Sequence, residues 1–470
     1  MKRFLSTVSL ALLALVQFGD RAHAQKRPNL TGAFFEFGTM DTVGVDNYLA
    51  EIHGLGETSI ITVGTITCKG MGAAPFDARY DWLERANESD VIRYLLSAAG
   101  GYGIKVYLGT VASESCDDTS GDADETGKLI DYYLANFGTY PSLAGWYLGN
   151  ESYIQDARWL TAEIDYFAPQ VAAIRARSNL PILQSPYLVN QWPGSPDVAA
   201  ECLQQFLAAT GIDVAVYEDA MGGRTGEYLG LSTYPTIGDY FASMAGAVGR
   251  ERLWVVHEVT PYPYVPADGV TSITRLNQAI SLVPDSVVGG RLLWTQQYYM
   301  SDTAEGRSFD SQRMLAQYRA THGFGSSVML PINEVLWVTR PSPDQSYLSS
   351  TLKDGIAGDP FLANDPEWVS APGQSAFIVD LGYPRSVNWV NLYVANLPAA
   401  GVKVPGTMVV FGSLDGASWY SIDYWSPLPG TSSDRDIGTQ SSLSAYARFL
   451  WIYLANDATT KLSEIEVIGQ

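Results

Sequence analysis

The chain has 470 residues, of which 46% are hydrophobic and 12% aromatic, and its formal net charge at pH 7 is −21. This composition supports large buried cores and excludes general disorder. Acidic and basic residues are mixed along the chain, so no basic face is available to bind nucleic acid or an anionic membrane by counterion release. The aromatic surplus favours surfaces that stack on flat apolar faces, sugars among them. The length predicts two or three domains.

The N-terminal segment has the pattern of a secretory signal peptide. Lys2 and Arg3 precede an apolar run over residues 4–18, and residues 22–24 (AHA) form a small-x-small cleavage site. We therefore expect a signal peptide over residues 1–24, cleavage after Ala24, and export to the periplasm or the medium. The apolar run is shorter than the roughly 20 residues that a membrane anchor needs. No later stretch is long and apolar enough to span a bilayer.

The cysteines and histidines limit the chemistry. An exported chain with Cys68, Cys116 and Cys202 is expected to hold one disulfide and one buried thiol. Cys68 and Cys116 follow the second and third predicted strands, so they are the expected pair. There is no CxxC spacing, and only three histidines follow the signal peptide. A His-rich catalytic metal site is thereby nearly excluded, and a Ser-His-Asp triad has little room. We expect no cofactor for catalysis.

From residue 30 to residue 322, short apolar runs alternate with amphipathic helical segments such as 90–103, 156–178 and 270–283. Eight segments are predicted as strands: 30–38, 58–66, 104–111, 143–150, 181–189, 213–219, 252–259 and 290–299. Alternating strands and helices imply parallel pairing, and eight such units over residues 25–325 predict a (β/α)8 TIM barrel. The competing fold is an open doubly wound sheet, but the chain has neither of the phosphate-binding glycine motifs that would support it.

Around residues 323–346 the pattern is interrupted by Gly, Ser and Pro, and residues 326–344 are predicted to be a linker. Residues 345–470 contain short alternating apolar runs with turns between them and no helical periodicity. These predict an antiparallel β-sandwich, with strands at 376–382, 387–394, 408–416, 447–454 and 464–469.

Acidic residues end several of the predicted barrel strands. The set consists of Glu36 on strand one, Glu151 on strand four, Glu218 and Asp219 on strand six, and Glu258 on strand seven. In barrel enzymes, residues at the C-terminal ends of strands usually carry the chemistry. Glycoside hydrolysis needs two carboxyl groups that flank one bond and have different pKa values. Strands four and seven lie roughly across the barrel mouth from each other, so their terminal side chains are expected to face one sugar. Alternatively, each acid could simply structure a surface loop.

This pattern resembles the retaining (β/α)8 glycosidases of clan A. The matching features are Asn150-Glu151 closing strand four, Glu258 closing strand seven and Trp294 on strand eight. The resemblance implies that Glu151 is the acid/base and Glu258 the nucleophile. It also implies that Asn150 binds the sugar 2-hydroxyl and that Trp294 forms the floor of the −1 subsite. For Trp294, packing inside the barrel is the alternative.

Residues 145–151, 213–223 and 252–258 together are also similar to a bacterial family of uncharacterised glycosidase-like barrels. That family carries a polar-Asp-x-x-Gly motif closing strand six, which implies that Glu218 and Asp219 belong to the site. Asp219 could either bind substrate or cap the Gly-rich loop that follows it. Tyr147, Gln296 and Tyr298 are further candidates to line the mouth, although strand alternation makes about half of such residues core. Glu36 is a candidate subsite residue.

The C-terminal region resembles the discoidin-like sandwich of coagulation factor C domains and related carbohydrate-binding modules. Five segments match: 350–359, Trp368, 378–382, 405–419 and 463–469. The resemblance implies a structural Ca²⁺ held by the loop from Asp354 to Asp359 and by Glu464, all hard oxygen donors. The alternative is a metal-free Asp-Gly turn. The fold itself does not name a ligand.

The sequence therefore predicts an exported retaining glycoside hydrolase that acts on a polysaccharide or oligosaccharide. One alternative is a non-catalytic protein for binding or assembling exopolysaccharide, with a degenerate barrel site. Another is an inverting hydrolase that uses Glu151 and Asp219. The sequence does not indicate the sugar, the linkage or the oligomeric state.

Overall fold

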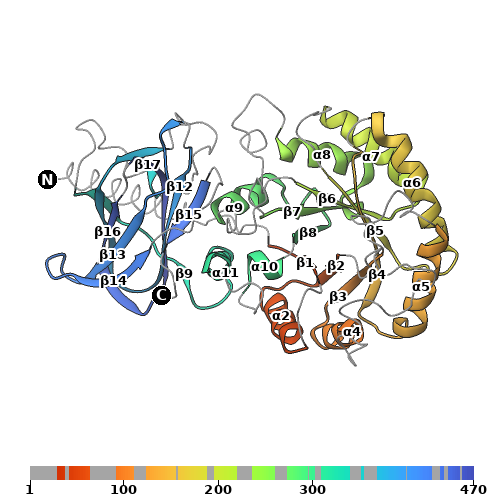
Figure 1. Cartoon of the computed structure of the whole chain (residues 1–470), viewed down its shortest axis with the longest axis horizontal. Helices are drawn as coiled ribbons and strands as arrows, with labels where there is room; N and C mark the ends of the chain where they lie inside the picture. The colour runs from red at the N-terminus through yellow and green to blue at the C-terminus, as the bar shows by residue number, and fades with distance from the viewer. Residues whose placement is uncertain are drawn as a thin grey trace, which may run out of the picture.

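The computed structural model forms an N-terminal barrel and a C-terminal β-sandwich, drawn in red to green and in blue in Figure 1. It describes residues 29–36, 42–63, 91–110, 123–154, 157–187, 195–219, 236–259, 273–294, 296–301, 309–338, 351–353, 368–397, 400–425, 434–438, 443–455 and 458–470. The predicted fold class, a TIM barrel followed by an antiparallel sandwich, is confirmed. The predicted signal peptide lies outside the described residues.

Eight parallel strands close the barrel in sequence order, each paired with the next and the last with the first. They are β1 (Gly32–Phe35), β2 (Ser59–Thr62), β3 (Lys105–Gly109), β4 (Leu143–Ser152), β5 (Ile182–Pro186), β6 (Val214–Glu218), β7 (Leu253–His257) and β8 (Gly290–Leu293). The helices around them are α2 (Thr42–Gly54), α4 (Val91–Tyr102), α5 (Ala123–Phe137), α6 (Ala157–Arg175), α7 (Pro196–Thr210), α8 (Ile237–Val248), α9 (Ile273–Leu282) and α11 (Phe309–His322).

Local sequence signals explain where these helices begin and end. Ser195 caps the N-terminus of α7, because its hydroxyl accepts a hydrogen bond from the backbone N–H of Val198, and Pro196 occupies the first turn. The same helix ends at Gly211, whose φ of 79° is a left-handed conformation that glycine adopts without strain. Thr236 and Asp239 form a reciprocal capping box at the start of α8.

The barrel interior is filled by one large apolar side chain from each strand. This layer consists of Phe34, Ile61, Tyr107, Tyr147, Leu183, Val216, Val256 and Leu292, all buried. Below it, the Trp254 ring lies against Gly290, where a Cβ atom would come within 2.5 Å of the indole. The interior is therefore packed, and only the C-terminal ends of the strands remain for a site.

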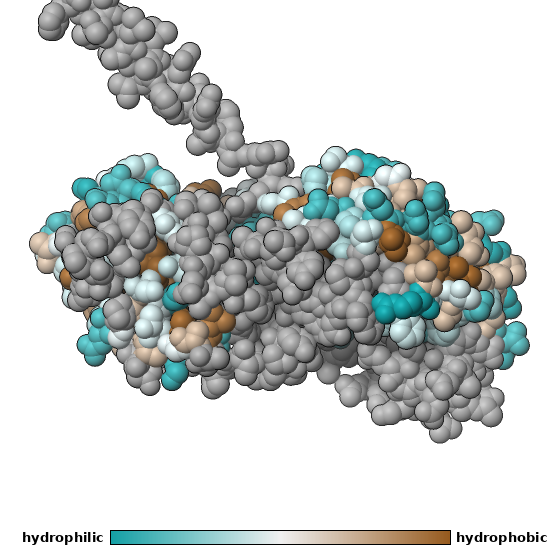
Figure 2. Space-filling model, turned by 90° about the horizontal axis from the view of Figure 1, so that it is seen from above, coloured by the Kyte–Doolittle hydropathy of each residue, from teal (hydrophilic) through white to brown (hydrophobic). Residues whose placement is uncertain are grey.

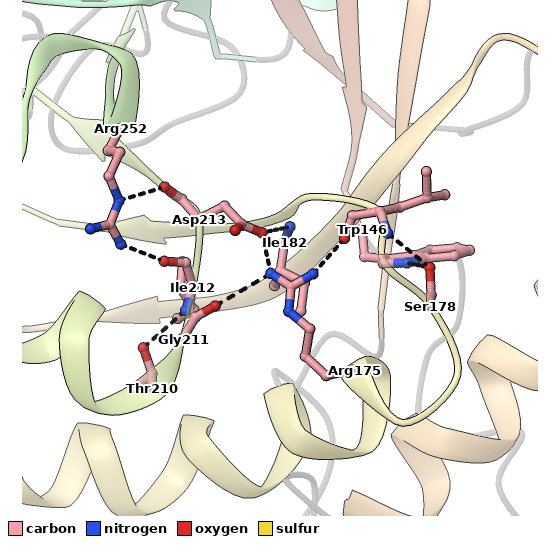
Figure 3. Close-up of polar contacts among 10 residues, drawn as sticks. Trp146, Arg175, Ser178, Ile182, Thr210, Gly211, Ile212, Asp213 and Arg252 are labelled. Carbon is pink, nitrogen blue, oxygen red and sulfur yellow. Dashed lines mark hydrogen bonds and ion pairs between the residues drawn. The ribbon is translucent and has the colours of Figure 1, made fainter.

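Polar contacts close the opposite, N-terminal end of the barrel, as Figure 3 shows. The Arg175 guanidinium donates to the carbonyl of Leu180 at 2.8 Å and forms an ion pair with Asp213. Asp213 also accepts from the backbone N–H of Ile182 at 2.7 Å. Arg252 donates to the Asp213 carbonyl at 3.1 Å. These bonds tie together the starts of β5, β6 and β7.

One predicted strand is corrected by the structure. The segment 290–299 was expected to be a single strand, but β8 ends at Leu293, and Gln296–Tyr299 forms a helical turn, α10. The side-chain carbonyl of Gln297 accepts from the backbone N–H of Glu36 at 3.1 Å, and its amide donates to the Glu36 carbonyl. The turn is thus bound to the end of β1, which the apolar run in the sequence did not reveal.

In the described residues the sandwich has nine strands, which pair antiparallel. They are β9 (Val328–Met329), β10 (Glu334–Trp337), β11 (Val369–Pro372), β12 (Ser375–Ala395), β13 (Thr407–Ser413), β14 (Tyr420–Trp425), β15 (Asp434–Gly438), β16 (Ala445–Ala455) and β17 (Thr459–Gly469). The long strand β12 pairs with β10 and β16 in its first half and with β15 and β17 in its second half. A register shift between Asp380 and Arg385 separates the halves.

The segment expected to be a linker contributes to the sandwich. Strand β9 pairs with β17, and β10 pairs with β12, so both lie within the sheet. Helix α11 packs against the same region, where Ala316 and Ala320 contact Trp389 and Ile468. The amide of Gln317 donates to Glu466 at 2.7 Å. The two domains therefore share a small apolar contact.

The exposed apolar side chains of the described residues include Val43 and Trp159 on barrel helices and Tyr420, Tyr424 and Tyr446 on sandwich strands. On the face shown in Figure 2, hydrophobic residues alternate with hydrophilic ones. Within the part of the chain that the structure describes, no helix is both long enough and apolar enough to cross a membrane.

Candidate active site

The layer above the packed interior is rich in acids. Because alternate strand residues point into a barrel, the residues two positions beyond the interior layer also point inward. At β1, β5, β6, β7 and β8 these residues are Glu36, Ser185, Glu218, Glu258 and Trp294. Three of these five side chains carry carboxyl groups. The mouth of the barrel is therefore acidic, as the sequence predicts for a glycosidase-like site.

Glu218 is the buried centre of this acidic group, with only 2% of its surface exposed. Its carboxyl oxygen Oε1 lies 2.7 Å from the hydroxyl of Ser185. Burial raises the pKa of Glu218 well above its ordinary range, and the negative charges of Glu151 and Glu258 raise it further. The charges of both acids raise the pKa of this one carboxyl group, so the side chains at the ends of β4, β6 and β7 interact electrostatically.

Glu151 reaches the mouth from an irregular part of β4. The pairing of β4 with β5 shifts between Leu148 and Ser152, where β4 contains two extra residues. Such a bulge re-aims side chains at the rim of a barrel. The Glu151 side chain is exposed, and its charge raises the pKa values of Glu218 and of Tyr147. The bulge therefore places Glu151 on the rim, above the buried layer.

The neighbouring Asn150 is held by the protein itself. Its amide donates a hydrogen bond to the hydroxyl of Tyr166 on α6, and its backbone carbonyl accepts from Gln184 at 2.7 Å. Gln184 also accepts from the hydroxyl of Ser152 at 3.1 Å. These bonds fix the backbone of the bulge, so Asn150 supports the position of Glu151.

Asp219 lies on the opposite side of the strand from Glu218. It is fully buried, its Oδ2 is 2.5 Å from Nδ1 of His257, and its Oδ1 accepts from the backbone N–H of Glu258 at 3.1 Å. Arg291 donates from Nη1 to Nε2 of His257 at 2.7 Å. Because Arg291 can only donate, Nε2 must accept, and the proton of His257 is on Nδ1, facing Asp219. These three side chains form a column on the outer face of the barrel.

Trp294, Tyr147 and Glu36 lie at or just below the mouth. The Trp294 ring is half-buried and packs on Phe34, with 4.8 Å between the ring centroids. Tyr147 is buried in the interior layer and forms a hydrogen bond with Ser185. Glu36 is half-buried at the end of β1, where Gln297 binds its backbone. The structure thus brings all three close to the acidic layer.

Gln296 does not extend this group. Gln296 is fully buried, and its amide donates to the carboxylate of Glu57 at 3.1 Å in its hydrogen-bonded orientation. Glu57 precedes β2, at the other end of that strand from the mouth. The side chain of Tyr298 lies outside the described residues.

Sequence reasoning missed Ser185, Gln297 and His257 as parts of this arrangement. Ser185 lies in a strand without charged residues, and its importance follows only from its contact with Glu218. His257 directly precedes the predicted nucleophile, but its role depends on Asp219 and Arg291, which are distant in sequence. The sequence offered one signal for these residues, which is that each lies at or just beyond the end of a barrel strand.

The cysteine and calcium predictions are only partly within the described residues. Cys202 is buried on α7, whereas Cys68 and Cys116 lie outside the described residues. Glu464 is a buried acid on β17, opposite Tyr393 of β12. Asp354 and Asp359 also lie outside the described residues. Among the side chains that are described, no group of three or more His, Cys, Asp and Glu could hold a metal ion.

The fold and the mouth define a (β/α)8 barrel with four glutamates at the C-terminal ends of its strands: Glu36, Glu151, Glu218 and Glu258. Residues 30–289 match the family described as "Domain of unknown function (DUF4434)", and the chain belongs to this family. The match spans the whole barrel up to the start of β8. No curated protein matches the chain significantly in sequence.

Solved structures with similar folds include glycoside hydrolases. A candidate alpha-L-fucosidase from Bacteroides thetaiotaomicron is 17% identical, covers 64% of this chain and 97% of its own, and has a TM-score of 0.49. A family 5 glycoside hydrolase from Bacteroides vulgatus is 12% identical, with 90% and 89% covered and a TM-score of 0.40. The C-terminal domain of a Bacteroides fragilis chitobiase is 16% identical and covers 30% of this chain and 97% of its own, with a TM-score of 0.23.

Proposed function

We propose that the chain is an exported retaining glycoside hydrolase that cleaves a polysaccharide or oligosaccharide. In this proposal Glu258 attacks the anomeric carbon while Glu151 protonates the leaving oxygen. Glu151 then activates a water molecule that hydrolyses the glycosyl-enzyme and releases the sugar. The observation that carries the proposal is the placement of the two acids at the C-terminal ends of the barrel strands, where a bulge in β4 positions Glu151 and a hydrogen bond to Asp219 anchors the backbone of Glu258.

The environments of the two acids suit these roles. Glu258 is half-buried, and its backbone is anchored by Asp219, which suits a nucleophile that must hold one position. Glu151 is on the exposed rim, where it can exchange protons with water between the two steps. Half-buried Trp294 and the exposed ring of Tyr153, which follows Glu151, offer aromatic surfaces for a sugar.

The inverting alternative with Asp219 has less support. Both carboxylate oxygens of Asp219 contact protein groups on the outer face of the barrel, and the side chain is fully buried. An inverting base must hold a water molecule beside the sugar. We therefore prefer Glu258 as the partner of Glu151.

The test is a screen of plant and bacterial polysaccharides for release of reducing ends. Wild type should be active on at least one polymer, and Glu151→Gln and Glu258→Gln should each abolish turnover while the fold is retained. Glu251→Gln is the matched control, because Glu251 lies just before the other end of β7, is exposed and pairs with Arg250. Binding of a polymer without hydrolysis would instead favour a non-catalytic exopolysaccharide-binding protein.

Export and the role of the sandwich complete the proposal. If the signal peptide is cleaved, the protein recovered from the periplasm or the medium should begin at Gln25, and an intact N-terminus there would contradict this.

We infer that the sandwich binds carbohydrate and holds the enzyme near its polymer. Affinity electrophoresis of the full chain in gels containing the substrate polymer should show retardation that persists in the Glu258→Gln variant.

A further inference from the structure

Ser185 is surrounded by three oxygen atoms. Its hydroxyl oxygen is 2.8 Å from the backbone carbonyl of Val216 and 2.7 Å from Oε1 of Glu218. It also forms a hydrogen bond with the hydroxyl of Tyr147. All four residues are buried. Water therefore does not compete for these bonds, and each pair of oxygens must share one proton.

The chemistry of these groups determines where the protons lie. A serine hydroxyl has one proton to donate and two lone pairs that accept. The carbonyl of Val216 has no proton, so the proton of Ser185 must go to it. The two lone pairs of Ser185 then accept from Tyr147 and from Glu218. Glu218 can donate only if its carboxyl group is protonated.

The surroundings of Glu218 favour the same state. Its side chain is almost completely buried, and this burial and the charges of Glu151, Glu258 and Asp219 raise its pKa by more than a hydrogen bond from Ser185 would lower it. A third negative charge beside Glu151 and Glu258 would be costly in so apolar a place. Burial also keeps the Tyr147 hydroxyl protonated, because it raises the pKa of that group well above its usual range.

We propose that Glu218 is a permanently protonated carboxyl group that serves as a positioning residue for the pair Glu151 and Glu258. Its proton is held by Ser185, and its neutrality keeps a third charge away from the mouth. Without that charge nearby, Glu258 can stay ionised for attack. This role rests on the proposed hydrolase function, but the protonation state of Glu218 does not.

The test uses Glu218→Gln, because a glutamine amide is neutral and carries one donor and one acceptor group, like a protonated carboxyl. We expect Glu218→Ala, which leaves Ser185 without its donor, to lower kcat/KM on the order of 100-fold, and Glu218→Gln to recover most of this loss, because the amide supplies a neutral donor in the same place. The alkaline limb of the pH–rate profile should be unchanged. A loss as large as that of Glu258→Gln would overturn the proposal.

Infrared difference spectroscopy decides the protonation state without any substrate. The spectrum of wild type minus Glu218→Gln at pH 7 should contain the C=O stretch of a protonated carboxylic acid, and this band should shift on deuteration. Glu251→Gln should give carboxylate bands only. Carboxylate bands for Glu218 would overturn the proposal, even if no substrate were found for the wild type.

Ser185→Ala provides a second, independent variant. It removes the acceptor for the proton of Glu218 and leaves the carboxyl group in place. We expect the C=O band of Glu218, obtained as Ser185→Ala minus the double variant with Glu218→Gln, to move in frequency because its hydrogen bond is lost. An unchanged band would show that Ser185 does not hold the proton, which would overturn the proposal.

Discussion

The carboxylate of Asp219 accepts a hydrogen bond from the backbone N–H of Glu258, with 3.1 Å between the two atoms. Its other oxygen is bound to His257, which in turn accepts from Arg291. Burial lowers the pKa of His257, so the ring remains neutral. Its one proton stays on Nδ1, from which it is donated to Asp219. The ends of β6 and β7 are thereby held together through side chains on the outer face of the barrel, directly behind the proposed nucleophile.

Replacing Asp219 should impair turnover more than substrate binding. In Asp219→Asn the amide offers only one acceptor oxygen, so either His257 or the backbone of Glu258 loses its partner. We expect kcat to fall by up to about 100-fold with KM nearly unchanged, because small displacements of a reacting group have effects of this size. Steady-state kinetics measure this, and Asp131→Asn, at an exposed ion pair with Arg177, is the control. An equal effect of both variants would contradict the positioning role.

The stability of the barrel should fall as pH rises, because of Glu218. The folded state raises the pKa of this group above its ordinary value of 4.5. The folded protein therefore binds the proton more tightly than the unfolded chain, and stability is greatest below the ordinary pKa and falls as pH rises toward the folded pKa.

The slope for one such group approaches about 1.4 kcal/mol per pH unit. Glu218→Gln should remove this part of the decline, so the variant gains stability relative to wild type, by roughly that slope, as pH rises from 4.5 toward the folded-state pKa. Urea unfolding at several pH values measures it. Parallel curves for the two proteins would contradict a buried neutral Glu218.

The polar network at the N-terminal end of the barrel should matter for stability alone. Arg175→Ala removes the hydrogen bonds to the carbonyls of Leu180 and Gly211 and the ion pair with Asp213 (Figure 3). Because both charged groups are partly exposed, we expect a loss of about 1–2 kcal/mol in the free energy of unfolding. Denaturant unfolding measures this loss, and kcat should be unchanged. A change in kcat would mean that the two ends of the barrel are coupled.

Calcium should stabilise the sandwich if the discoidin-like resemblance extends to its metal site. Glu464 offers a buried carboxylate, which is a suitable oxygen donor for Ca²⁺. At about 100 times its Kd, Ca²⁺ should add about 2.7 kcal/mol to stability. Thermal unfolding with Ca²⁺ and with a chelator measures this, and Glu464→Gln should abolish the difference. Identical unfolding of wild type in both conditions would exclude the site.

The sequence was sufficient to predict the barrel and the sandwich, because each has a strong periodic signal. Alternating buried strands and amphipathic helices imply parallel pairing, and the eight strands close in sequence order. The end of the last barrel strand could not be predicted. The apolar run continues beyond Leu293, but the chain forms the helical turn α10 there instead of a strand. The side chain of Gln297 in this turn binds the end of β1.

The acidic layer was also predictable, but its division into roles was not. Glu218 and Asp219 are adjacent in sequence, and only the interior position of Val216 shows that Glu218 points inward and Asp219 outward. The neutral state of Glu218 depends on Ser185 and Tyr147, which come from two other strands. Such relationships between strands arise only when the barrel closes.

The most direct test of the proposed function is the anomeric configuration of the first product, followed by proton NMR during hydrolysis of an active substrate. Attack by Glu258 followed by release through Glu151 predicts that the first product has the same configuration as the substrate. A product of inverted configuration would contradict Glu258 as the nucleophile and require a water molecule between the two acids.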